Sequence, residues 1–232
     1  MSGFHNLAVT MTHRERLFGW LYLLTELFLL PLVLQSINAW LPTPLADHWL
    51  NFLYFLINFL FTCFLFRSFL KKSLAQAGKQ TEHFLLVTFY GFGYYYLANL
   101  VLGIVIRLLA PDFANLNDGS IAQQTQENFL IMAISTVLLA PVAEELLYRG
   151  LIFGSLYEKK PWMAYLFSSV LFSSVHILGY IFVYPLPHLL IAFVQYLPAG
   201  LALAWAYRKS GSIFSSILIH ATVNAMALLA LR

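Results

Sequence analysis

The stretch PWMAYLFSSVLFSSVHILGYIFVYPLPHLLIAFVQYLPAGLALAWAY, residues 161–207, contains no Asp, Glu, Lys or Arg. A helix needs about 20 apolar residues to cross a bilayer, so this stretch is long enough for two crossings. Its residues 179–187, GYIFVYPLP, carry the glycine and prolines that are typical of a turn between two helices. The sequence therefore predicts membrane-spanning helices.

The composition of the whole chain agrees with that prediction. Of 232 residues, 60% are hydrophobic and only 10% are charged, whereas a soluble domain carries about 25% charged residues. These values exclude a cytosolic globular enzyme, a disordered chain and a nucleic-acid binder. The single cysteine, Cys63, excludes a disulfide framework and a cysteine-based zinc cluster.

Five further apolar stretches bring the predicted number of spans to about seven. Each carries three charged residues or fewer: residues 17–40, 49–66, 84–110, 129–157 and 211–231. We therefore expect an all-α, polytopic integral membrane helical bundle in which residues 1–232 form a single membrane domain. The polar segment 111–127 is expected to be a surface loop with a short interfacial helix.

The basic residues predict the orientation of the chain. They precede the first span and follow the second, fourth and sixth spans, which places them on one side of the membrane: Arg14, Arg16, Arg67, Lys71, Lys72, Lys79, Lys159, Lys160, Arg208 and Lys209. Basic loops face the cytoplasm. The N-terminus is therefore expected to be cytoplasmic and the C-terminus to lie outside.

The segment AEELLYRG, residues 143–150, places three charges inside an otherwise apolar span. A charge at the centre of a span costs roughly 2.5–3.5 kcal/mol on insertion scales. Glu145 and Arg149 are four residues apart and can neutralise each other, while Glu144 points about 100° away and has no partner on its own helix. Pro141 should weaken or kink this helix. Either the glutamates belong to a structural polar network, or Glu144 has a chemical role.

Two histidines lie in uncharged spans at a similar depth. His176 follows Phe172 by four residues, and His220 precedes Asn224 by four. At about 1.5 Å per residue, Glu144, His176 and His220 lie roughly 20, 22 and 13 Å from the cytoplasmic ends of their helices. These depths overlap within the uncertainty of the span ends, so the three helices are predicted to meet at one buried polar pocket. The other histidines are expected to be solvated or interfacial: His5, His13, His48, His83 and His188.

Such a pocket has the groups that peptide-bond hydrolysis by activated water requires. A buried carboxyl can accept a proton from water, and imidazole and amide groups can donate hydrogen bonds to a developing oxyanion. No GxSxG motif is present, and Cys63 has no nearby histidine in the sequence. A catalytic zinc held by two histidines and one glutamate stays open, although HExxH is absent.

These residues resemble the three ordered motifs of the CPBP family. The matching groups are Glu144-Glu145-x-x-x-Arg149, Phe172-x-x-x-His176 and His220-x-x-x-Asn224. That family contains the CAAX prenyl endopeptidases and the bacterial Abi-type, bacteriocin-immunity membrane proteins. The resemblance covers residues 128–228, a catalytic core, whereas residues 1–127 hold spans of unassigned role.

The resemblance implies an intramembrane endopeptidase that cleaves a membrane-associated peptide or protein. Glu144 would be the general base that activates water, with assistance from His176, and His220 with Asn224 would form the oxyanion site. The remaining motif residues would shape the pocket: Glu145, Arg149 and Phe172. No cofactor is expected, and the metal-dependent mechanism is the alternative within this class.

The expected location is a bacterial cell membrane, since the chain is small and its positive-inside pattern is compact. The expected partners are a membrane-associated substrate and the lipid bilayer, with no nucleic acid. Two other functions stay open. One is a non-catalytic bacteriocin-immunity or scaffold protein that binds a peptide or partner in the same cavity. The other is a transporter or proton relay, which would favour paired broken helices, and the sequence shows no repeat.

Overall fold

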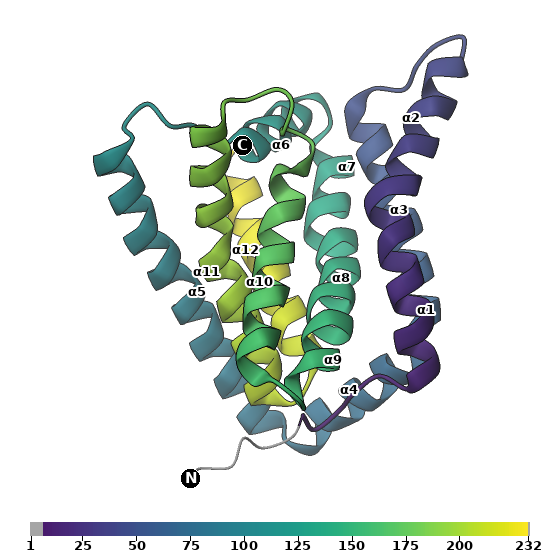
Figure 1. The fold of residues 1–232 in the computed structure, drawn as a ribbon, viewed down its shortest axis with the longest axis vertical. Coiled ribbons are helices and arrows are strands. Elements are labelled where there is room, and N and C mark those ends of the chain that lie inside the picture. Colours follow the sequence, from purple (N-terminus) through teal and green to yellow (C-terminus); the bar gives the residue numbers. More distant parts are fainter. Residues whose placement is uncertain (1–6, 232) are drawn as a thin grey trace.

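The computed structural model describes residues 7–231, which form a bundle of helices (Figure 1). In chain order the elements are α1 (His13–Leu24), the π-helical η1 (Thr25–Leu29), α2 (Leu30–Trp40), α3 (Asp47–Leu65), α4 (Arg67–Lys79), α5 (Thr81–Leu109), α6 (Leu116–Glu127), α7 (Phe129–Ala133), the π-helical η2 (Ile134–Leu139), α8 (Ala140–Glu145), the π-helical η3 (Leu146–Phe153), α9 (Gly154–Tyr157), α10 (Pro161–Leu178), α11 (Leu186–Ser210) and α12 (Ile213–Ala230). His5 lies outside the described residues.

The predicted spans are confirmed. Within residues 7–231, seven helices are long and apolar enough to cross a membrane: His13–Trp40, Asp47–Leu65, Thr81–Leu109, Phe129–Tyr157, Pro161–Leu178, Leu186–Ser210 and Ile213–Ala230. The two crossings expected in residues 161–207 are α10 and α11, joined by a turn at residues 179–185. The protein is therefore an all-α, multi-pass membrane protein.

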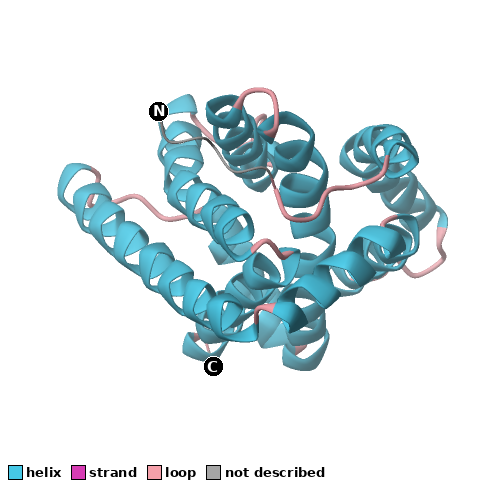
Figure 2. Ribbon diagram, turned by 90° about the horizontal axis from the view of Figure 1, so that it is seen from below, coloured by secondary structure: helices cyan, strands magenta, loops and turns pink. Residues whose placement is uncertain are grey.

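The fourth span, α7 to α9, lies at the centre of the bundle. It packs against α3 on one side and against α10 and α12 on the other, while α5 packs on α11 and α12 at the outer edge (Figures 1 and 2). Among the 18 most apolar consecutive residues of the fourth span, 56% are buried inside the bundle. Among the corresponding 18 residues of α5, none is buried. The fourth span can therefore carry charged side chains away from lipid, whereas α5 is a lipid-facing helix.

Two spans change from π-helical to α-helical hydrogen bonding at a proline. Pro31 and Pro141 are each the second residue of an α-helix that follows a π-helical segment. Proline lacks an N–H and its ring clashes with the carbonyl four residues earlier, and a wider turn removes that conflict. In the first span the amide of Leu30 donates to Thr25 O, five residues earlier. The expected weak point at Pro141 is present as such a turn, and π-helical turns are frequent at functional sites.

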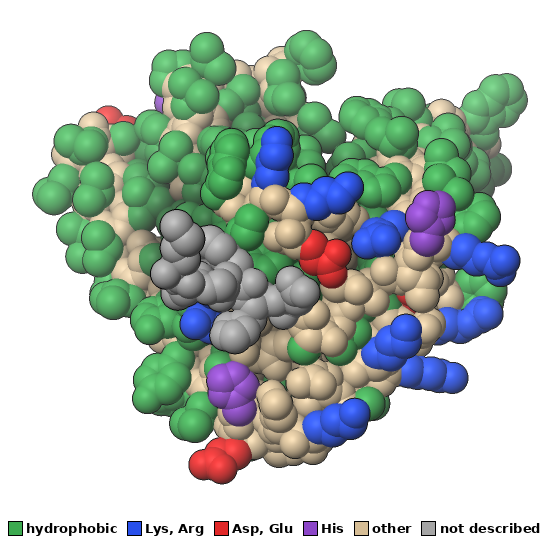
Figure 3. Space-filling model, turned by 60° about the horizontal axis from the view of Figure 1, so that its bottom comes forward, with side chains coloured by type: hydrophobic (Ala, Val, Ile, Leu, Met, Phe, Trp, Pro, Cys, Tyr) green, Lys and Arg blue, Asp and Glu red, His purple; other side chains and the backbone are tan. Residues whose placement is uncertain are grey.

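The surface helix α4 was not predicted from the sequence, where its basic residues indicated only the side of the membrane. Phe69, Ser73 and Ala77 are four residues apart and form its buried face, and its basic residues lie on the opposite, exposed side. The helix lies across one end of the bundle (Figure 1), and the Lys and Arg side chains gather on that end (Figure 3). The basic side chains therefore gather at one end of the bundle, as expected if all the basic loops lie on one side of the membrane.

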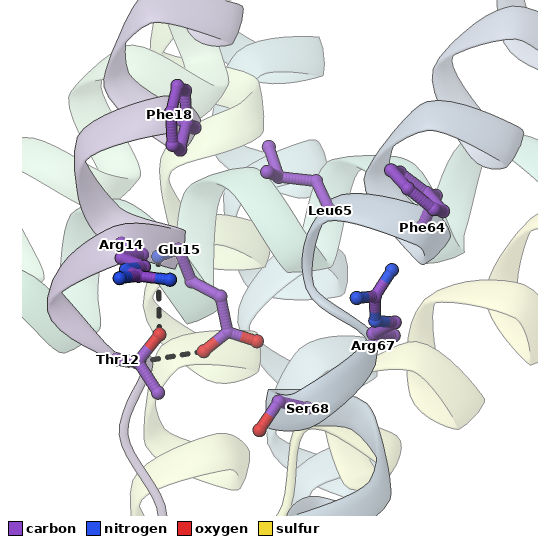
Figure 4. Close-up of a pocket in the computed structure, with 8 residues that line it drawn as sticks. All are labelled: Thr12, Arg14, Glu15, Phe18, Phe64, Leu65, Arg67 and Ser68. Atoms are coloured by element: carbon purple, nitrogen blue, oxygen red, sulfur yellow. Dashed lines mark hydrogen bonds between the residues drawn. The ribbon is translucent and has the colours of Figure 1, made fainter.

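The start of the first span is fixed to α4 by Glu15. The carboxylate of Glu15 accepts from the Thr12 amide at 2.8 Å, and the Thr12 hydroxyl accepts from the Glu15 amide at 3.2 Å, which forms a capping box. The other carboxylate oxygen accepts from the Phe69 amide at 2.9 Å. Figure 4 shows this cap beside a pocket lined by Phe18, Phe64 and neighbouring residues.

His48 was expected to be solvated or interfacial, and the structure excludes the first of these, because His48 is buried and its Nδ1 lies 2.9 Å from Glu127 Oε2. On the same side Asn51 Nδ2 donates to Gln124 Oε1 at 2.6 Å. These contacts hold α6 against α3, and α6 is the short helix that was expected within residues 111–127.

Gly200 allows α10 and α11 to approach closely. A Cβ atom at Gly200 would lie 2.8 Å from the backbone Cα of Ser169. The carbonyl of Gly200 also accepts from Arg149 Nη2 at 3.3 Å. The absence of a side chain at this position therefore lets α11 reach both α10 and the fourth span.

We predict that Gly200→Ala destabilises the protein by about 1–3 kcal/mol, since the new methyl group would force two backbones apart. Thermal unfolding in detergent, followed by size-exclusion chromatography, measures the effect. The matched control is Gly103→Ala on α5, where a Cβ atom would meet nothing within 4 Å. Equal stability of the two variants would contradict the close approach.

Candidate active site

The expected ion pair between Glu145 and Arg149 is present at the centre of the bundle. Arg149 Nη1 donates to Glu145 Oε1 at 2.8 Å, and both side chains are 0% exposed. The guanidinium carbon also lies 4.2 Å from the centre of the Phe172 ring. A buried charge requires a partner, and here the cation has a carboxylate, the Gly200 carbonyl and an aromatic face.

His220 lies between the two glutamates. Its Nδ1 is 2.9 Å from Glu145 Oε1, and its Nε2 is 3.9 Å from Glu144 Oε2. Since the Glu145 carboxylate accepts hydrogen bonds, the Nδ1 atom carries the proton. The Nε2 atom of the neutral imidazole then presents its lone pair toward Glu144. Glu145 therefore sets both the orientation and the tautomer of His220.

Glu144 is the glutamate without a hydrogen-bond partner. Its Oε2 atom is buried and has no hydrogen-bond partner among the described residues, although 17% of the side chain is exposed. This oxygen lies 3.9 Å from His220 Nε2. The predicted convergence of these two side chains is therefore present, from α8 and α12.

His176 joins the cluster through aromatic contacts. The Phe172 ring lies 4.6 Å from the His176 ring and 5.8 Å from the His220 ring. His176 Nδ1 lies 2.7 Å from the carbonyl oxygen of Phe172, so Nδ1 is the donor and Nε2 carries the lone pair. The His176 ring also stacks on the Tyr196 ring, with their centres 4.2 Å apart.

Tyr196 was missed by the sequence analysis. Its ring fixes His176, and its hydroxyl contacts Asn115 and Asp118 at the N-terminal end of α6. Partial burial raises the pKa of the Asp118 carboxyl. A tyrosine in an uncharged span does not stand out in the sequence as a site residue. Its role depends on the tertiary packing, which brings α11 beside α10 and α6.

Asn224 lies on the same face of α12 as His220. Its Nδ2 atom donates to the carbonyl oxygen of Thr136 in η2 at 2.8 Å. One amide hydrogen is thus used to fix α12 against the fourth span, and the amide has a second hydrogen to donate. The residue is positioned by the π-helical turn that precedes Pro141.

Glu26 was not predicted as a site residue. Glu26 is the single charge of residues 17–40 and is only 6% exposed. A charge inside an apolar span is costly, so its position in the sequence already indicated a special role. In the structure its Oε1 atom accepts from the Tyr54 hydroxyl at 2.6 Å, and its Oε2 atom is buried without a hydrogen-bond partner among the described residues.

The residues present give limited support to a metal site. Within residues 7–231, no group of three or more His, Cys, Asp or Glu side chains is arranged to hold a metal ion. His220 faces one carboxyl group through each of its ring nitrogens, and His176 is held by a carbonyl. The metal-free mechanism and the zinc mechanism remain predictions to be tested by experiment.

A comparison with protein families identifies the segment that holds these residues. Residues 126–226 match the family model described as type II CAAX prenyl endopeptidase Rce1-like. These residues form an Rce1-like domain. All three motifs noted in the sequence lie inside the Rce1-like domain, and the resemblance to the CAAX prenyl endopeptidases is confirmed.

Two bacterial proteins are similar to part of the chain. "UPF0177 protein YxdF" of Lactococcus lactis subsp. lactis (strain IL1403) is 39% identical over 87 residues, which cover 38% of this chain and 42% of the relative. "Putative membrane peptidase YdiL" of Bacillus subtilis (strain 168) is 33% identical over 100 residues, which cover 43% of this chain and 36% of the relative. The chain thus matches about two fifths of each relative's length. No solved structure matches the chain.

We predict that Arg149→Met destabilises the protein by about 3–5 kcal/mol, since it leaves Glu145 as an uncompensated buried charge. The double variant Glu145→Gln/Arg149→Met should recover part of that loss, because both charges are then removed. Thermal unfolding in detergent measures both. Arg67→Met, at an exposed position on α4, is the control and should change stability by about 0.5 kcal/mol or less. A double variant no more stable than Arg149→Met would contradict the pairing.

Proposed function

We propose that the protein is an intramembrane endopeptidase that hydrolyses a peptide bond of a membrane-associated peptide or protein through a glutamate-activated water. The observation that carries the proposal is the buried, unpartnered Oε2 of Glu144, which faces the Nε2 lone pair of His220 at 3.9 Å. That separation is too long for a direct hydrogen bond. A water molecule between the two atoms could bond to both. The location of the pair within the Rce1-like domain supports the same activity.

In this proposal Glu144 is the general base. Its carboxylate removes a proton from the water as the water oxygen attacks the peptide carbonyl carbon. A carboxylate with a free oxygen in a low-dielectric site is suited to that transfer, since nothing else occupies its lone pairs. Glu145 has a different role in this proposal, because its Oε1 atom binds both Arg149 and His220 and its charge compensates the buried guanidinium, although its Oε2 atom also has no hydrogen-bond partner among the described residues.

His220 and Asn224 stabilise the oxyanion. Hydrogen-bond donors directed at developing charge contribute strongly in a site that excludes water. His220 donates from Nε2 once the proton that Glu144 took from the attacking water has passed to that atom, and the Glu145 carboxylate at Nδ1 compensates the charge of the doubly protonated ring. Asn224 donates its second amide hydrogen. His176 assists by accepting from the attacking water at Nε2, since its Nδ1 is bonded to Phe172.

The proposed setting is a bacterial cell membrane with the N-terminus in the cytoplasm. The basic end of the bundle supports this orientation, because basic loops are retained on the cytoplasmic side. Both similar proteins are bacterial, and bacteria generally lack prenylated CAAX proteins. The proposed substrate is therefore another membrane-associated peptide or protein, cleaved where its chain enters the bilayer.

We predict that Glu144→Gln lowers the rate of cleavage by about 10²–10⁴-fold, the range for loss of a general base, while the variant stays folded. The assay uses purified protein in lipid vesicles with a library of membrane-anchored peptides that carry a fluorophore and a quencher. The control is Glu82→Gln, an exposed glutamate at the start of α5, which should cleave at the wild-type rate. Full activity of Glu144→Gln would contradict the mechanism and would favour a binding or scaffold role for the cavity.

We also predict that the activity is independent of a bound metal. Elemental analysis of the purified protein should show no stoichiometric zinc, and treatment with a chelator followed by dialysis should leave the cleavage rate unchanged. Stoichiometric zinc together with loss of activity on chelation would replace the glutamate mechanism with a zinc-bound water.

A further inference from the structure

The α1–α4 cleft, formed by the start of α1 and the turn from α3 into α4, lies at the end of the bundle where the Lys and Arg side chains gather. Figure 4 shows Arg14 on one wall and Arg67 on the other, with Phe18, Leu65 and Phe64 on the side toward the spans. The cleft holds about 260 Å³, just below the about 300–1,000 Å³ of typical small-molecule sites. It has room for one small polar group.

The two arginines of this cleft have no anionic partner in the protein. The salt bridges of the described residues involve neither Arg14 nor Arg67. The guanidinium carbon of Arg67 lies 4.9 Å from the centre of the Phe64 ring, a contact that attracts a cation but does not neutralise it. Both arginines are exposed, so their N–H groups can bind a ligand.

The carboxylate in the cleft is already engaged. Among the described residues that line the cleft, Glu15 is the one acid. Its Oε2 accepts from the Thr12 amide and its Oε1 from the Phe69 amide, and it forms no ion pair with either arginine. Two guanidinium groups and one carboxylate leave a net charge of +1 in the cleft, which one monovalent anion would neutralise.

Both walls carry a cation at the end of a span and an aromatic ring one turn deeper. Arg14 is the second residue of the first span, and Phe18 lies four residues further in, about 6 Å along the helix. Arg67 follows the second span by two residues, and Phe64 lies three residues before it. Phe18 is 55% exposed and Phe64 is 67% exposed, so both rings face lipid. The cleft is therefore cationic at the level of the headgroups and apolar at the level of the acyl chains.

A phospholipid has its groups in the same order. Its phosphate lies in the polar headgroup region, and its acyl chains extend from there into the hydrocarbon core. Arginine binds phosphate through paired N–H groups, and the exposed rings of Phe18 and Phe64 can pack on an acyl chain. A soluble phosphate would use the arginines alone and would leave these rings without a role.

We propose that the α1–α4 cleft binds an anionic phospholipid whose headgroup carries one net negative charge. The phosphate lies between Arg14 and Arg67, and an acyl chain packs on Phe18 and Phe64. The bound lipid bridges α1 and α4 beside the bond from Glu15 to the Phe69 amide, and it stabilises the attachment of α4 to the bundle. This site is separate from the proposed peptidase activity and does not depend on it.

The first test measures lipid binding by native mass spectrometry of the purified protein in detergent. The wild type should bind dioleoylphosphatidylglycerol about tenfold more tightly than dioleoylphosphatidylcholine, which has the same chains and no net charge. Arg14→Gln/Arg67→Gln should weaken the binding of phosphatidylglycerol by about tenfold or more, because charge-assisted hydrogen bonds are lost. Arg14→Lys/Arg67→Lys should lie between the two, since lysine keeps the charge without the paired donors.

A second cleft on the opposite face of α1 provides the matched control. It is lined by Arg16, Lys159 and Trp20, and it also contains the exposed carboxylate of Glu158. Arg16→Gln/Lys159→Gln removes the same charge from the same end of the bundle and should leave the affinity for phosphatidylglycerol unchanged. An equal loss of affinity in the two double variants would show diffuse attraction to the basic end and would overturn the proposal.

Thermal unfolding in detergent separates a lipid site from a site for a soluble anion. Phosphatidylglycerol should raise the unfolding temperature of the wild type and leave that of Arg14→Gln/Arg67→Gln unchanged. Inorganic phosphate at the same concentration should have no effect. An equal rise with inorganic phosphate would identify a site for a soluble anion, and an equal rise with phosphatidylcholine would identify an apolar contact without charge selectivity. Either result would overturn the proposal.

Discussion

The ion pair between the Arg149 guanidinium and Glu145 is the interaction on which the polar centre of this protein depends. Both side chains are fully buried inside the bundle, where an unpaired charge would cost several kcal/mol. The same Glu145 oxygen that compensates Arg149 also bonds to His220 Nδ1. One carboxylate therefore neutralises a cation and orients an imidazole, and the second ring nitrogen is directed at Glu144.

The two adjacent glutamates thus have different environments. Each has a buried Oε2 atom without a hydrogen-bond partner among the described residues, but Glu145 also binds Arg149 and His220 through its Oε1 atom, whereas Glu144 only faces His220 at 3.9 Å. The proline at position 141 and the π-helical turn before it bring a carbonyl of the fourth span to Asn224. A similar proline-linked turn in the first span holds Glu26. These features are the basis on which we propose Glu144 as the general base.

Much of the fold follows from the positions of charges in the sequence. Apolar stretches of sufficient length predict the spans. The four-residue spacing of Glu145 and Arg149 predicts their ion pair, because residues four apart lie on the same face of a helix. The overlapping depths of Glu144 and His220 along their spans predict that the two side chains meet. The buried contact of His48 with Glu127 and the stacking of Tyr196 on His176 were missed, since each joins residues that are far apart in sequence. Helix α4 was missed because it is too short and too basic to be read as a span.

The central claim is that a water molecule lies between the carboxyl group of Glu144 and the Nε2 atom of His220. An experimental density map of the protein in lipid, at a resolution that shows ordered water, tests it most directly. The account predicts a water within about 2.7–3.2 Å of both atoms. Direct contact between the two side chains, or a metal ion about 2.0–2.2 Å from both, would contradict it.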